Sequence, residues 1–255
     1  MELALPPGFD PAAVDLTRLD PAELSQLEAL LEEEREYQSG RLFYRTFPSE
    51  GPRRLELYPK QAEFFRVGRT FRERCFMAAN RVGKTFSGAY EVTCHLTGDY
   101  PEWWEGKRFD HPIRAWACGK TNETTRDIVQ ANLLGMVKHG NRKDVDGTGM
   151  VPRELIGDIT WKQGVADLVD TIKVYHVPTG GWSLLGFKSY QQGRGSFEGT
   201  AQHVAWCDEE PPEDVYGEIL IRTATTAGIV LITFTPLEGM SKVVMQFQEA
   251  EYRLE

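Results

Sequence analysis

A Gly-Lys-Thr triplet, residues 83 to 85, joins a short apolar run at 75–78 to a stretch of helical character. The pattern is that of a phosphate-binding loop (P-loop), G-x-x-x-x-G-K-[ST], with Ala78 at the first glycine position. In such a loop, backbone N–H groups and the N-terminus of the following helix surround a polyphosphate. We expect Lys84 to contact the β- and γ-phosphates and the Thr85 hydroxyl to bind Mg²⁺. The alternative is an ordinary strand–turn–helix with a lysine that faces solvent.

Acidic residues follow a second apolar run. Residues 204–207 read Val-Ala-Trp-Cys and lead into Asp208, Glu209 and Glu210. A run of this length suits a buried parallel strand, and open α/β sheets bind ligands at the carboxyl ends of such strands. We expect Asp208 to hold Mg²⁺ and Glu209 to activate the water that attacks the γ-phosphate. The doubled glutamate leaves the choice of base open, and an acidic loop after a core strand is the simpler alternative.

Two further segments carry polar side chains at the ends of expected elements. Residues 229–232 indicate another buried strand, and Thr233 and Thr235 belong to the polar turn that follows it. Pro59 suits the first position of a helix, which places Gln61 in the first helical turn. A glutamine amide can donate and accept at one edge of adenine. Taken singly, these residues are equally typical of a common turn and of a helix surface.

In chain order these segments are a Tyr-Pro-x-Gln element, the Asn-Arg-Val-Gly-Lys-Thr P-loop, Cys-Asp-Glu-Glu and Thr-Phe-Thr-Pro-Leu-Glu-Gly. This series resembles the ATPase domain of the large terminase subunit of tailed bacteriophages, over roughly residues 55–245. The resemblance implies an α/β fold, a P-loop ATPase of the additional-strand, RecA-like type with a mainly parallel central sheet flanked by helices. It implies ATP as substrate and Mg²⁺ as cofactor. The implied activity is that of a motor that couples ATP hydrolysis to the translocation of double-stranded DNA into a procapsid.

The resemblance also assigns roles to single residues. The implied nucleotide-binding set is Gln61, Ala78, Ala79, Asn80, Arg81, Val82, Gly83, Lys84 and Thr85. Thr85 and Asp208 are the implied metal residues, and Glu209 is the implied base. Thr233 and Thr235 lie in the family's coupling motif, with no indication of which one couples hydrolysis to motion. An arginine just before the P-loop glycine is typical of the family, so Arg81 is the candidate for a charge-stabilising arginine within one subunit.

Packaging motors work as rings in which one subunit offers an arginine to the ATP of its neighbour. Such an arginine can raise the rate by about 10³ to 10⁵. Arg194, which stands between two glycines in the loop 191–199, is our first candidate, with Arg126 and Arg222 behind it. The alternative role of Arg194 is to keep the loop soluble.

The implied partners are double-stranded DNA, the portal protein and the small terminase subunit. The implied assembly is a homo-oligomeric ring on the procapsid, monomeric in isolation, in the host cytoplasm and transiently at the portal vertex, without secretion or membrane contact. The net charge of −9 predicts weak DNA binding by this chain alone, because phosphate contacts usually leave a basic footprint. Two other classes stay open: a RecA-like helicase or remodelling ATPase, which normally needs a second such domain, and a nucleotide-binding scaffold without turnover.

The chain divides into an N-terminal extension at 1–54 and an ATPase core at 55–255. The extension contains an expected amphipathic helix over about 20–38, which begins with an Asp-Pro-x-Glu capping signal, and a linker with glycines and prolines at 40–54. No acidic cluster suited to two metals follows the coupling motif. We therefore expect the family's C-terminal nuclease domain, and DNA cleavage, to be absent.

Within the core, the pattern predicts a strand at 113–118, a helix at 122–138 and a hairpin at 171–190. A Trp-Trp pair at 103–104 is expected to pack in the protein, with stacking on a nucleic-acid base as the alternative. The four cysteines are far apart and indicate free thiols. The sequence has no apolar run of about 18 residues and no signal peptide.

Overall fold

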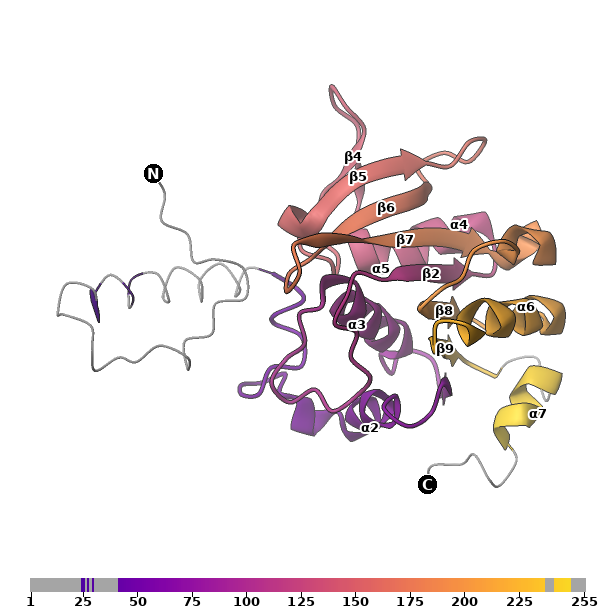
Figure 1. Cartoon of the computed structure of the whole chain (residues 1–255), viewed down its shortest axis with the longest axis horizontal. Helices are drawn as coiled ribbons and strands as arrows, with labels where there is room; N and C mark the ends of the chain where they lie inside the picture. Colours follow the sequence, from indigo (N-terminus) through magenta and orange to yellow (C-terminus); the bar gives the residue numbers. More distant parts are fainter. Residues whose placement is uncertain (1–23, 26, 28, 30–40, 237–240, 249–255) are drawn as a thin grey trace.

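The computed structural model of the chain describes residues 41–236 and 241–248, together with 24, 25, 27 and 29. The helix expected over about 20–38 therefore lies almost entirely outside the described residues. Figure 1 shows a central sheet with helices on both of its faces. In the described part of the chain, no helix is long and apolar enough to span a membrane.

A seven-stranded sheet forms the centre of the described residues, in the order β1-β9-β8-β2-β7-β6-β5. Its strands are β1 (Glu73–Met77), β2 (Arg114–Gly119), β5 (Ile156–Trp161), β6 (Val169–His176), β7 (Gly181–Ser189), β8 (Val204–Asp208) and β9 (Ile229–Phe234). A separate antiparallel pair consists of β3 (Val137–Lys138) and β4 (Asp144–Val145). The strands from β1 to β7 in this order are parallel, and β6 and β5 are added antiparallel. β9 lies between the P-loop strand β1 and the acidic strand β8, which confirms the additional-strand α/β class.

Helices cover both faces of this sheet (Figure 1). The described α-helices are α2 (Pro59–Val67), α3 (Lys84–Thr97), α4 (Asn122–Thr124), α5 (Ala131–Leu134), α6 (Glu213–Ala224) and α7 (Lys242–Gln248), and a π-helical turn at Thr125–Gln130 joins α4 to α5. Short 3-10 segments occur at Leu55–Leu57, Arg153–Leu155, Tyr190–Gln192 and Arg194–Phe197. Helices α2 and α3 pack on one face, and α6 and α7 pack on the other.

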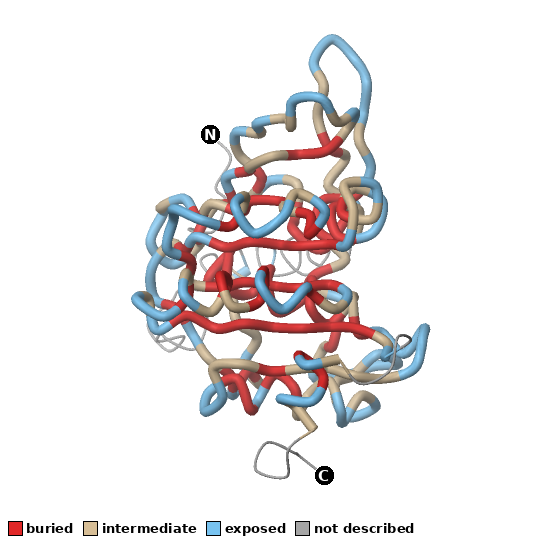
Figure 2. Tube along the Cα trace, turned by 90° about the vertical axis from the view of Figure 1, so that its right-hand side faces the viewer, coloured by how far each residue is buried: buried red, intermediate tan, exposed pale blue. Residues whose placement is uncertain are grey.

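The alternation of side chains along β8 explains its continuous apolar sequence. Trp206 points into the core that contains α3, and Cys207 points into the core that contains α6. Because successive side chains of a strand point to opposite faces, a strand covered on both sides needs apolar residues at every position. Figure 2 shows buried chain segments in the middle of the molecule and exposed segments around them. The strand predicted at 113–118 and the hairpin at 171–190 are confirmed as β2 and β6–β7, and the four cysteines are free thiols.

The helix expected over 122–138 is shorter than predicted and ends at Leu134. Gly135 follows with φ of 82°, and a Cβ at this position would lie 2.1 Å from the Asp146 carboxylate. Only glycine fits both the left-handed conformation and the close approach. The chain then turns into β3, so Lys138 belongs to a strand and the basic residues after it to the β3–β4 connection.

Residues 40–54, expected to form a linker, include two side chains of the main core. Phe43 and Phe47 are 4% and 5% exposed. The Phe47 ring packs edge-on against Phe65 of α2 with 5.6 Å between the ring centroids. Trp103 donates its indole N–H to the Phe47 carbonyl (2.8 Å), which places the Trp-Trp pair in the same aromatic cluster, as predicted. The glycines and prolines of this segment are typical of a linker, but its two phenylalanines supply the apolar area that packs it against the core.

Candidate functional site

The turn between β1 and α3 occupies the place assigned to the P-loop. Arg81 (φ 63°) and Gly83 (φ 84°) both have left-handed backbone conformations, as a tight turn requires. Gly83 precedes α3 without a side-chain cap, which leaves the first N–H groups of the helix for another acceptor. An anion at the N-terminus of this 14-residue helix is stabilised both by those N–H groups and by the helix dipole.

Lys84 is the first residue of α3, and its ammonium group points back into the loop. Its Nζ donates to the Ala79 carbonyl (2.7 Å) and to Thr235 Oγ1 (2.9 Å). Thr235 Oγ1 in turn donates to Asn80 Oδ1 (2.7 Å). Burial lowers the pKa of Lys84 from its ordinary value, and two nearby carboxylates oppose that shift. The lysine is thus a largely buried cation that donates to two neutral oxygens, which phosphate oxygens can replace.

Asp208 ends β8 and receives two hydroxyl donors on one oxygen. Thr85 Oγ1 donates to Asp208 Oδ1 (2.9 Å), and Thr233 Oγ1 donates to the same oxygen (2.8 Å). Asp208 is 4% exposed, and burial raises its pKa to about 6 against the opposing effect of the two hydroxyl groups. A buried carboxylate beside a hydroxyl is suited to Mg²⁺, which takes one or two carboxylates together with phosphate oxygens and water. Among the described residues, no group of three or more His, Cys, Asp or Glu side chains is arranged to hold a metal by itself.

Glu209 follows in an unusual backbone conformation, with φ of 67°. Its N–H donates to the Thr233 carbonyl (2.9 Å), and its own carbonyl accepts from the Tyr190 hydroxyl (3.0 Å). Burial raises the pKa of Glu209, while Lys84 and Lys120 oppose that shift. The residue is therefore fixed through its backbone, and its carboxylate lies within the electrostatic reach of the P-loop lysine.

Glu210 has a different environment. It accepts a hydrogen bond from Ser241 Oγ, and that serine oxygen accepts from the Val244 N–H (3.1 Å) in the first turn of α7. Glu210 is thus hydrogen-bonded to the serine that precedes α7, whereas the positive charge of Lys84 acts on the carboxylate of Glu209. The difference favours Glu209 as the candidate base.

Gln61 lies against the P-loop, where its Nε2 donates to the Val82 carbonyl (3.0 Å). A cavity of about 550 Å³ opens beside this contact. Its lining consists of Leu42, Thr46, Phe47, Arg53, Tyr58, Gln61, Arg81, Val82, Gly83 and Phe86. Aromatic rings together with one amide suit a planar base. The structure therefore brings Gln61, Arg81 and the P-loop glycine to one cavity.

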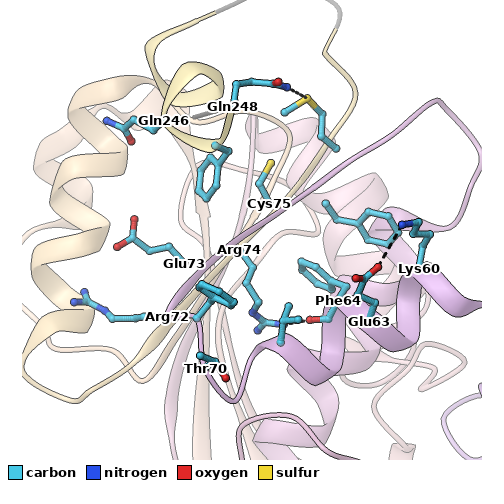
Figure 3. A pocket seen from close by; sticks show the side chains of 15 residues that line it. Lys60, Glu63, Phe64, Thr70, Arg72, Glu73, Arg74, Cys75, Gln246 and Gln248 are labelled. Atoms are coloured by element: carbon cyan, nitrogen blue, oxygen red, sulfur yellow. Dashed lines mark hydrogen bonds and ion pairs between the residues drawn. The ribbon is translucent and has the colours of Figure 1, made fainter. Parts of the chain in front are cut away.

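A larger cavity, of about 760 Å³, lies along the free edge of β1, with α2 and α7 beside it (Figure 3). In the described residues, β1 pairs only with β9, so its other edge faces this cavity. The lining includes Lys60, Glu63, Arg72 and Glu73 but none of the residues that the sequence predicted for the site. Gln61, Arg81, Val82 and Gly83 of the predicted nucleotide-binding set line the smaller cavity instead.

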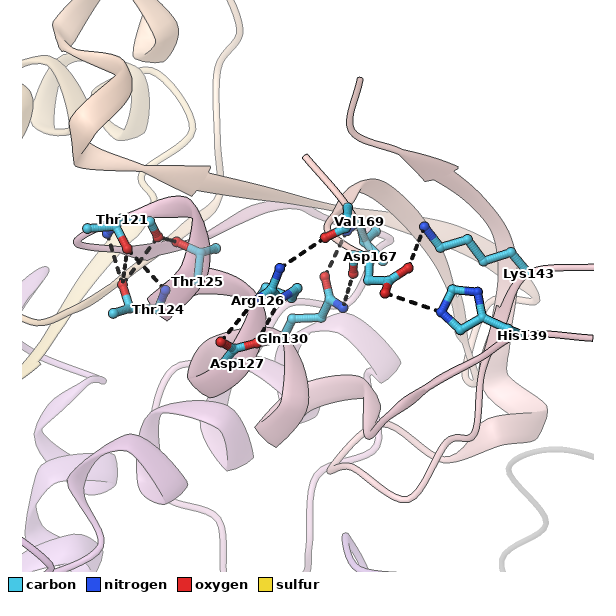
Figure 4. A network of polar contacts seen from close by, with 11 residues as sticks. Thr121, Thr124, Thr125, Arg126, Asp127, Gln130, His139, Lys143, Asp167 and Val169 are labelled. Atoms are coloured by element: carbon cyan, nitrogen blue, oxygen red, sulfur yellow. Dashed lines mark hydrogen bonds and ion pairs between the residues drawn. The ribbon is translucent and has the colours of Figure 1, made fainter. Parts of the chain in front are cut away.

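Each of the three arginines considered for a neighbouring subunit is paired with a carboxylate. Arg194 is exposed, as its glycine-rich loop predicts, yet its Nε donates to Glu218 Oε2 (3.1 Å). Arg222 pairs with the other oxygen of this buried glutamate at 2.6 Å. Arg126 pairs with Asp127 at 2.6 Å in the π-helical turn (Figure 4). In the part of the chain that is described, none of these three arginines forms a hydrogen bond with the P-loop, with Asp208 or with Glu209.

The sequence did not predict two aromatic residues of the site. Trp206 donates its indole N–H to Thr233 Oγ1 (2.8 Å), and the Tyr190 hydroxyl lies within bonding distance of the carbonyls of Asp208 (3.3 Å) and Glu209 (3.0 Å). Both are buried and are typical core residues from their sequence context. A signal for Trp206 was present, because a buried indole N–H needs an acceptor. Tyr190 carried none, because its acceptors are backbone carbonyls, which every sequence supplies.

A family profile and a relative from another phage match the part of the chain that contains the P-loop and the acidic residues after β8. The profile of the family described as terminase large subunit, T4likevirus-type, N-terminal, matches residues 75–253. The chain is 41% identical over 250 residues to the large terminase subunit of Salmonella phage P22, in an alignment that covers 91% of this chain and 47% of the P22 protein. It thus spans about half the length of that relative. Among solved structures, the large terminase of a thermophilic bacteriophage matches with a TM-score of 0.47 and 12% identity, over 68% of this chain and 37% of that one.

Proposed function

Because this chain belongs to the T4likevirus-type family of terminase large subunits, whose N-terminal part it matches, we propose that it hydrolyses ATP to drive double-stranded DNA into a procapsid. The observation that carries the proposal is that three segments far apart in the sequence meet at the carboxyl ends of β1, β8 and β9. Thr85 reaches Asp208 across 123 sequence positions, and Lys84 reaches Thr235 across 151. These contacts bring Lys84, the Thr85–Asp208 pair and Thr235 together around one loop, which supports the roles proposed for them.

The residues present fit Mg²⁺ and ATP. Asp208 and Thr85 offer a buried carboxylate and a hydroxyl 2.9 Å apart, next to the helix N-terminus that suits the phosphates. These two residues would hold the metal, and phosphate oxygens and water would complete its shell. When bound, Mg²⁺ neutralises charge that develops between the β- and γ-phosphates.

The remaining roles fall to side chains of this chain. Lys84 exchanges its neutral oxygen partners for phosphate oxygens and stabilises the charge of the transferring phosphoryl group. Arg81, exposed at the cavity mouth, adds a second cation from the same subunit. Glu209 orients a water and accepts its proton, and its raised pKa brings its basicity closer to neutral pH. Gln61 reads the adenine edge beside the loop.

Thr235, not Thr233, is the coupling residue in this proposal. Thr233 is 1% exposed and bonded to Asp208 on one side and Trp206 on the other. Thr235 joins β9 to the P-loop through Lys84. A γ-phosphate that recruits the lysine competes with this bond, so the phosphate state is transmitted to the segment between β9 and α7.

Arg194 stays our candidate for the arginine supplied to a neighbouring subunit, and its bond to Glu218 must then break on assembly. We expect Arg194→Ala to change ATP hydrolysis by the isolated chain by less than about twofold and to slow the assembled motor by about 10³-fold. Full turnover by the assembled motor with Arg194→Ala would exclude Arg194 from this role. The same comparison with Arg222→Ala tests the other arginine on Glu218.

The proposed setting is a packaging motor in the host cytoplasm, transiently at the portal vertex. Its proposed partners are double-stranded DNA, the portal protein and the small terminase subunit, and its proposed assembly is a ring on the procapsid. The division of the chain at residue 55 and the lack of DNA cleavage stay predictions. Metal-dependent nicking of plasmid DNA by the purified chain would contradict the second of these.

A binding and turnover experiment tests the proposed function. We expect the wild-type chain to bind ATP and to release phosphate only with Mg²⁺, and Lys84→Ala to lose at least about tenfold in ATP affinity. Lys60→Ala, an exposed lysine of α2, is the matched control and should stay within about twofold of wild type. Binding without turnover would favour the scaffold, and a wild-type chain that binds no ATP would contradict the proposal.

A further inference from the structure

We propose that Trp206 is a positioning residue for the metal-binding Asp208 and acts through the hydroxyl of Thr233. This inference rests on the proposed function, because it concerns the Mg²⁺ site of that function. Trp206 contacts neither nucleotide nor metal in this scheme. It sets the direction of the hydrogen bond that Thr233 makes to Asp208.

The position of Trp206 connects the P-loop helix to the acidic strand. It lies two residues before Asp208 on β8, is fully buried and faces the core that contains α3. A Cβ built on Gly88 would lie 2.4 Å from Trp206 Nε1, so the helix lies directly against the indole. Gly88 is three residues after Thr85 on the same helix. The indole therefore lies between β8, which carries Asp208, and α3, which carries Thr85.

The direction of each hydrogen bond follows from the chemistry of the groups. An indole N–H can only donate, so Thr233 Oγ1 is the acceptor in its 2.8 Å contact with Trp206. The Thr233 hydroxyl keeps one proton to donate, and Asp208 Oδ1 lies 2.8 Å away. An ionised carboxylate can only accept. The bonds therefore run from Trp206 through Thr233 to Asp208 and cannot be reversed.

This fixed direction determines how Asp208 presents its second oxygen. Thr85 and Thr233 both donate to Oδ1, which leaves Oδ2 outside these two bonds. Thr85 is itself an expected metal ligand, whereas Thr233 is buried and has no such second role. Without the indole donor, the Thr233 hydroxyl can rotate away, and the carboxylate loses the bond that fixes its orientation toward the metal.

Trp206 differs from two other tryptophans of the chain in the kind of group that accepts its indole N–H. Two other buried or half-buried tryptophans in this chain satisfy their N–H groups with backbone carbonyls: Trp103 donates to Phe47 (2.8 Å), and Trp104 donates to Lys107 (3.0 Å). Trp206 instead donates to the one hydroxyl that contacts the acidic residue from β9. The choice of acceptor distinguishes Trp206 from these two structural tryptophans.

The test is a double-mutant cycle on the full chain, with Trp206→Phe, Thr233→Val and the double variant. The measurement is the affinity for a fluorescent ATP analogue as Mg²⁺ is titrated and again in EDTA, with thermal unfolding in parallel. We expect each single variant to raise the Mg²⁺ concentration for half-maximal binding by about fivefold, the effect of one hydrogen bond, and to leave binding in EDTA unchanged. The double variant should equal Thr233→Val, because the indole acts only through that hydroxyl.

Two controls separate this role from packing. Trp182→Phe removes a tryptophan that is 48% exposed on β7 and should leave the Mg²⁺ dependence as in wild type. Thr233→Ser removes a methyl group but keeps the hydroxyl, so we expect it to retain Mg²⁺ affinity. If packing were the cause, Mg²⁺ affinity would fall in this variant as well. Should Trp206→Phe fail to fold, benzothienylalanine at position 206 keeps the ring shape without the N–H and tests the same bond.

The outcomes are distinct. Additive losses in the double variant would overturn the proposal, because additivity means that the indole acts independently of Thr233. So would normal Mg²⁺ dependence in the variant that lacks the N–H. A wild-type chain whose nucleotide binding does not respond to Mg²⁺ contradicts the proposed function as well, whereas a normal wild type with an unaffected Trp206 variant contradicts only this inference.

Discussion

Lys84 Nζ and Thr235 Oγ1 stand 151 positions apart in the sequence and are joined by a hydrogen bond of 2.9 Å. The bond ties the first residue of α3 to the segment that leaves β9. Asn80 accepts the proton of the same hydroxyl (2.7 Å), so the P-loop contacts Thr235 at two points. A phosphate that binds Lys84 competes for its ammonium group, and Thr235 is thereby sensitive to what occupies the loop.

This relationship predicts that Thr235→Val uncouples the phosphate from α7. ATP affinity should stay within about threefold of wild type, because the valine removes one neutral hydrogen bond from the lysine. Amide hydrogen exchange in α7 should differ between the ADP complex and the complex with a non-hydrolysable ATP analogue in wild type, and the difference should vanish in the variant. Thr70→Val, on an exposed turn, is the control. A difference that persists in Thr235→Val would exclude this threonine as the sensor.

The raised pKa values of Asp208 and Glu209 predict how ATP hydrolysis changes as the pH falls below neutrality. Burial raises the pKa of Asp208 to about 6 and raises that of Glu209 above its ordinary value. A raised carboxyl pKa means that protonation begins at a higher pH, so kcat/KM for ATP should fall as the pH drops below about 6. The fall in kcat should occur at lower pH, because a bound cation favours the ionised form of Asp208. Steady-state hydrolysis between about pH 5 and 8 checks this, and a kcat/KM that stays level down to pH 5 speaks against it.

Asp208 also lowers the stability of the nucleotide-free protein at neutral pH. Its folded pKa lies above its unfolded value, so its contribution favours folding fully below about pH 4 and is lost as the pH rises through about 6. Asp208→Asn should therefore raise the free energy of unfolding at pH 7.5 by about 1 to 3 kcal/mol, and by about 1 kcal/mol less at pH 5. Urea unfolding without Mg²⁺ at both pH values measures the difference. An equal gain at both would show that the carboxyl is not the cause.

A buried ion pair holds β1 against the P-loop helix. Arg74 Nη2 lies 2.6 Å from Glu91 Oε1, and both side chains are almost fully buried. Burial opposes ionisation of Glu91, yet Arg74 and His95 outweigh it, so the pKa of Glu91 lies below its ordinary value. Arg74→Met should cost about 3 to 5 kcal/mol of unfolding free energy, because it leaves a buried charge without its partner.

The exposed pair of Lys60 and Glu63 provides the comparison. Lys60→Met should cost less than about 1 kcal/mol in the same urea titration, because solvent screens that pair. Similar losses in the two variants would mean that the Arg74 pair contributes no more than a surface contact.

Strands β8 and β9 were predictable because burial on both faces permits few other sequences. Residues 204–207 and 229–232 are apolar throughout and lie in these two strands, whereas the apolar residues 75–77 lie in β1, which is mostly half-buried. The P-loop was predictable from its spacing, since a backbone cradle followed by a lysine needs a fixed number of residues. The order of the strands was not encoded in any local pattern. The place of β9 between β1 and β8 is seen only in the structure, because periodicity does not tell which strands are neighbours.

Contacts between distant side chains could not be predicted from the sequence. Trp206 and Thr233 lie 27 positions apart and meet only because β8 and β9 are adjacent. The pairing of Arg194 with Glu218 depends in the same way on how its loop packs on α6. The end of the helix at Leu134 was predictable in principle, because a glycine directly after a helix is a common stop signal.

The most direct test of the account compares hydrolysis by Glu209→Gln and Glu210→Gln under saturating Mg²⁺ and ATP, with ATP binding measured for both. We predict that Glu209→Gln binds ATP normally and loses about 10² to 10⁴ in kcat, because a general base contributes an effect of that size. Glu210, bonded to Ser241 at α7, should tolerate the same change with kcat within about threefold of wild type. A Glu209→Gln chain that hydrolyses ATP at the wild-type rate would contradict the assignment of the base and, with it, the proposed mechanism.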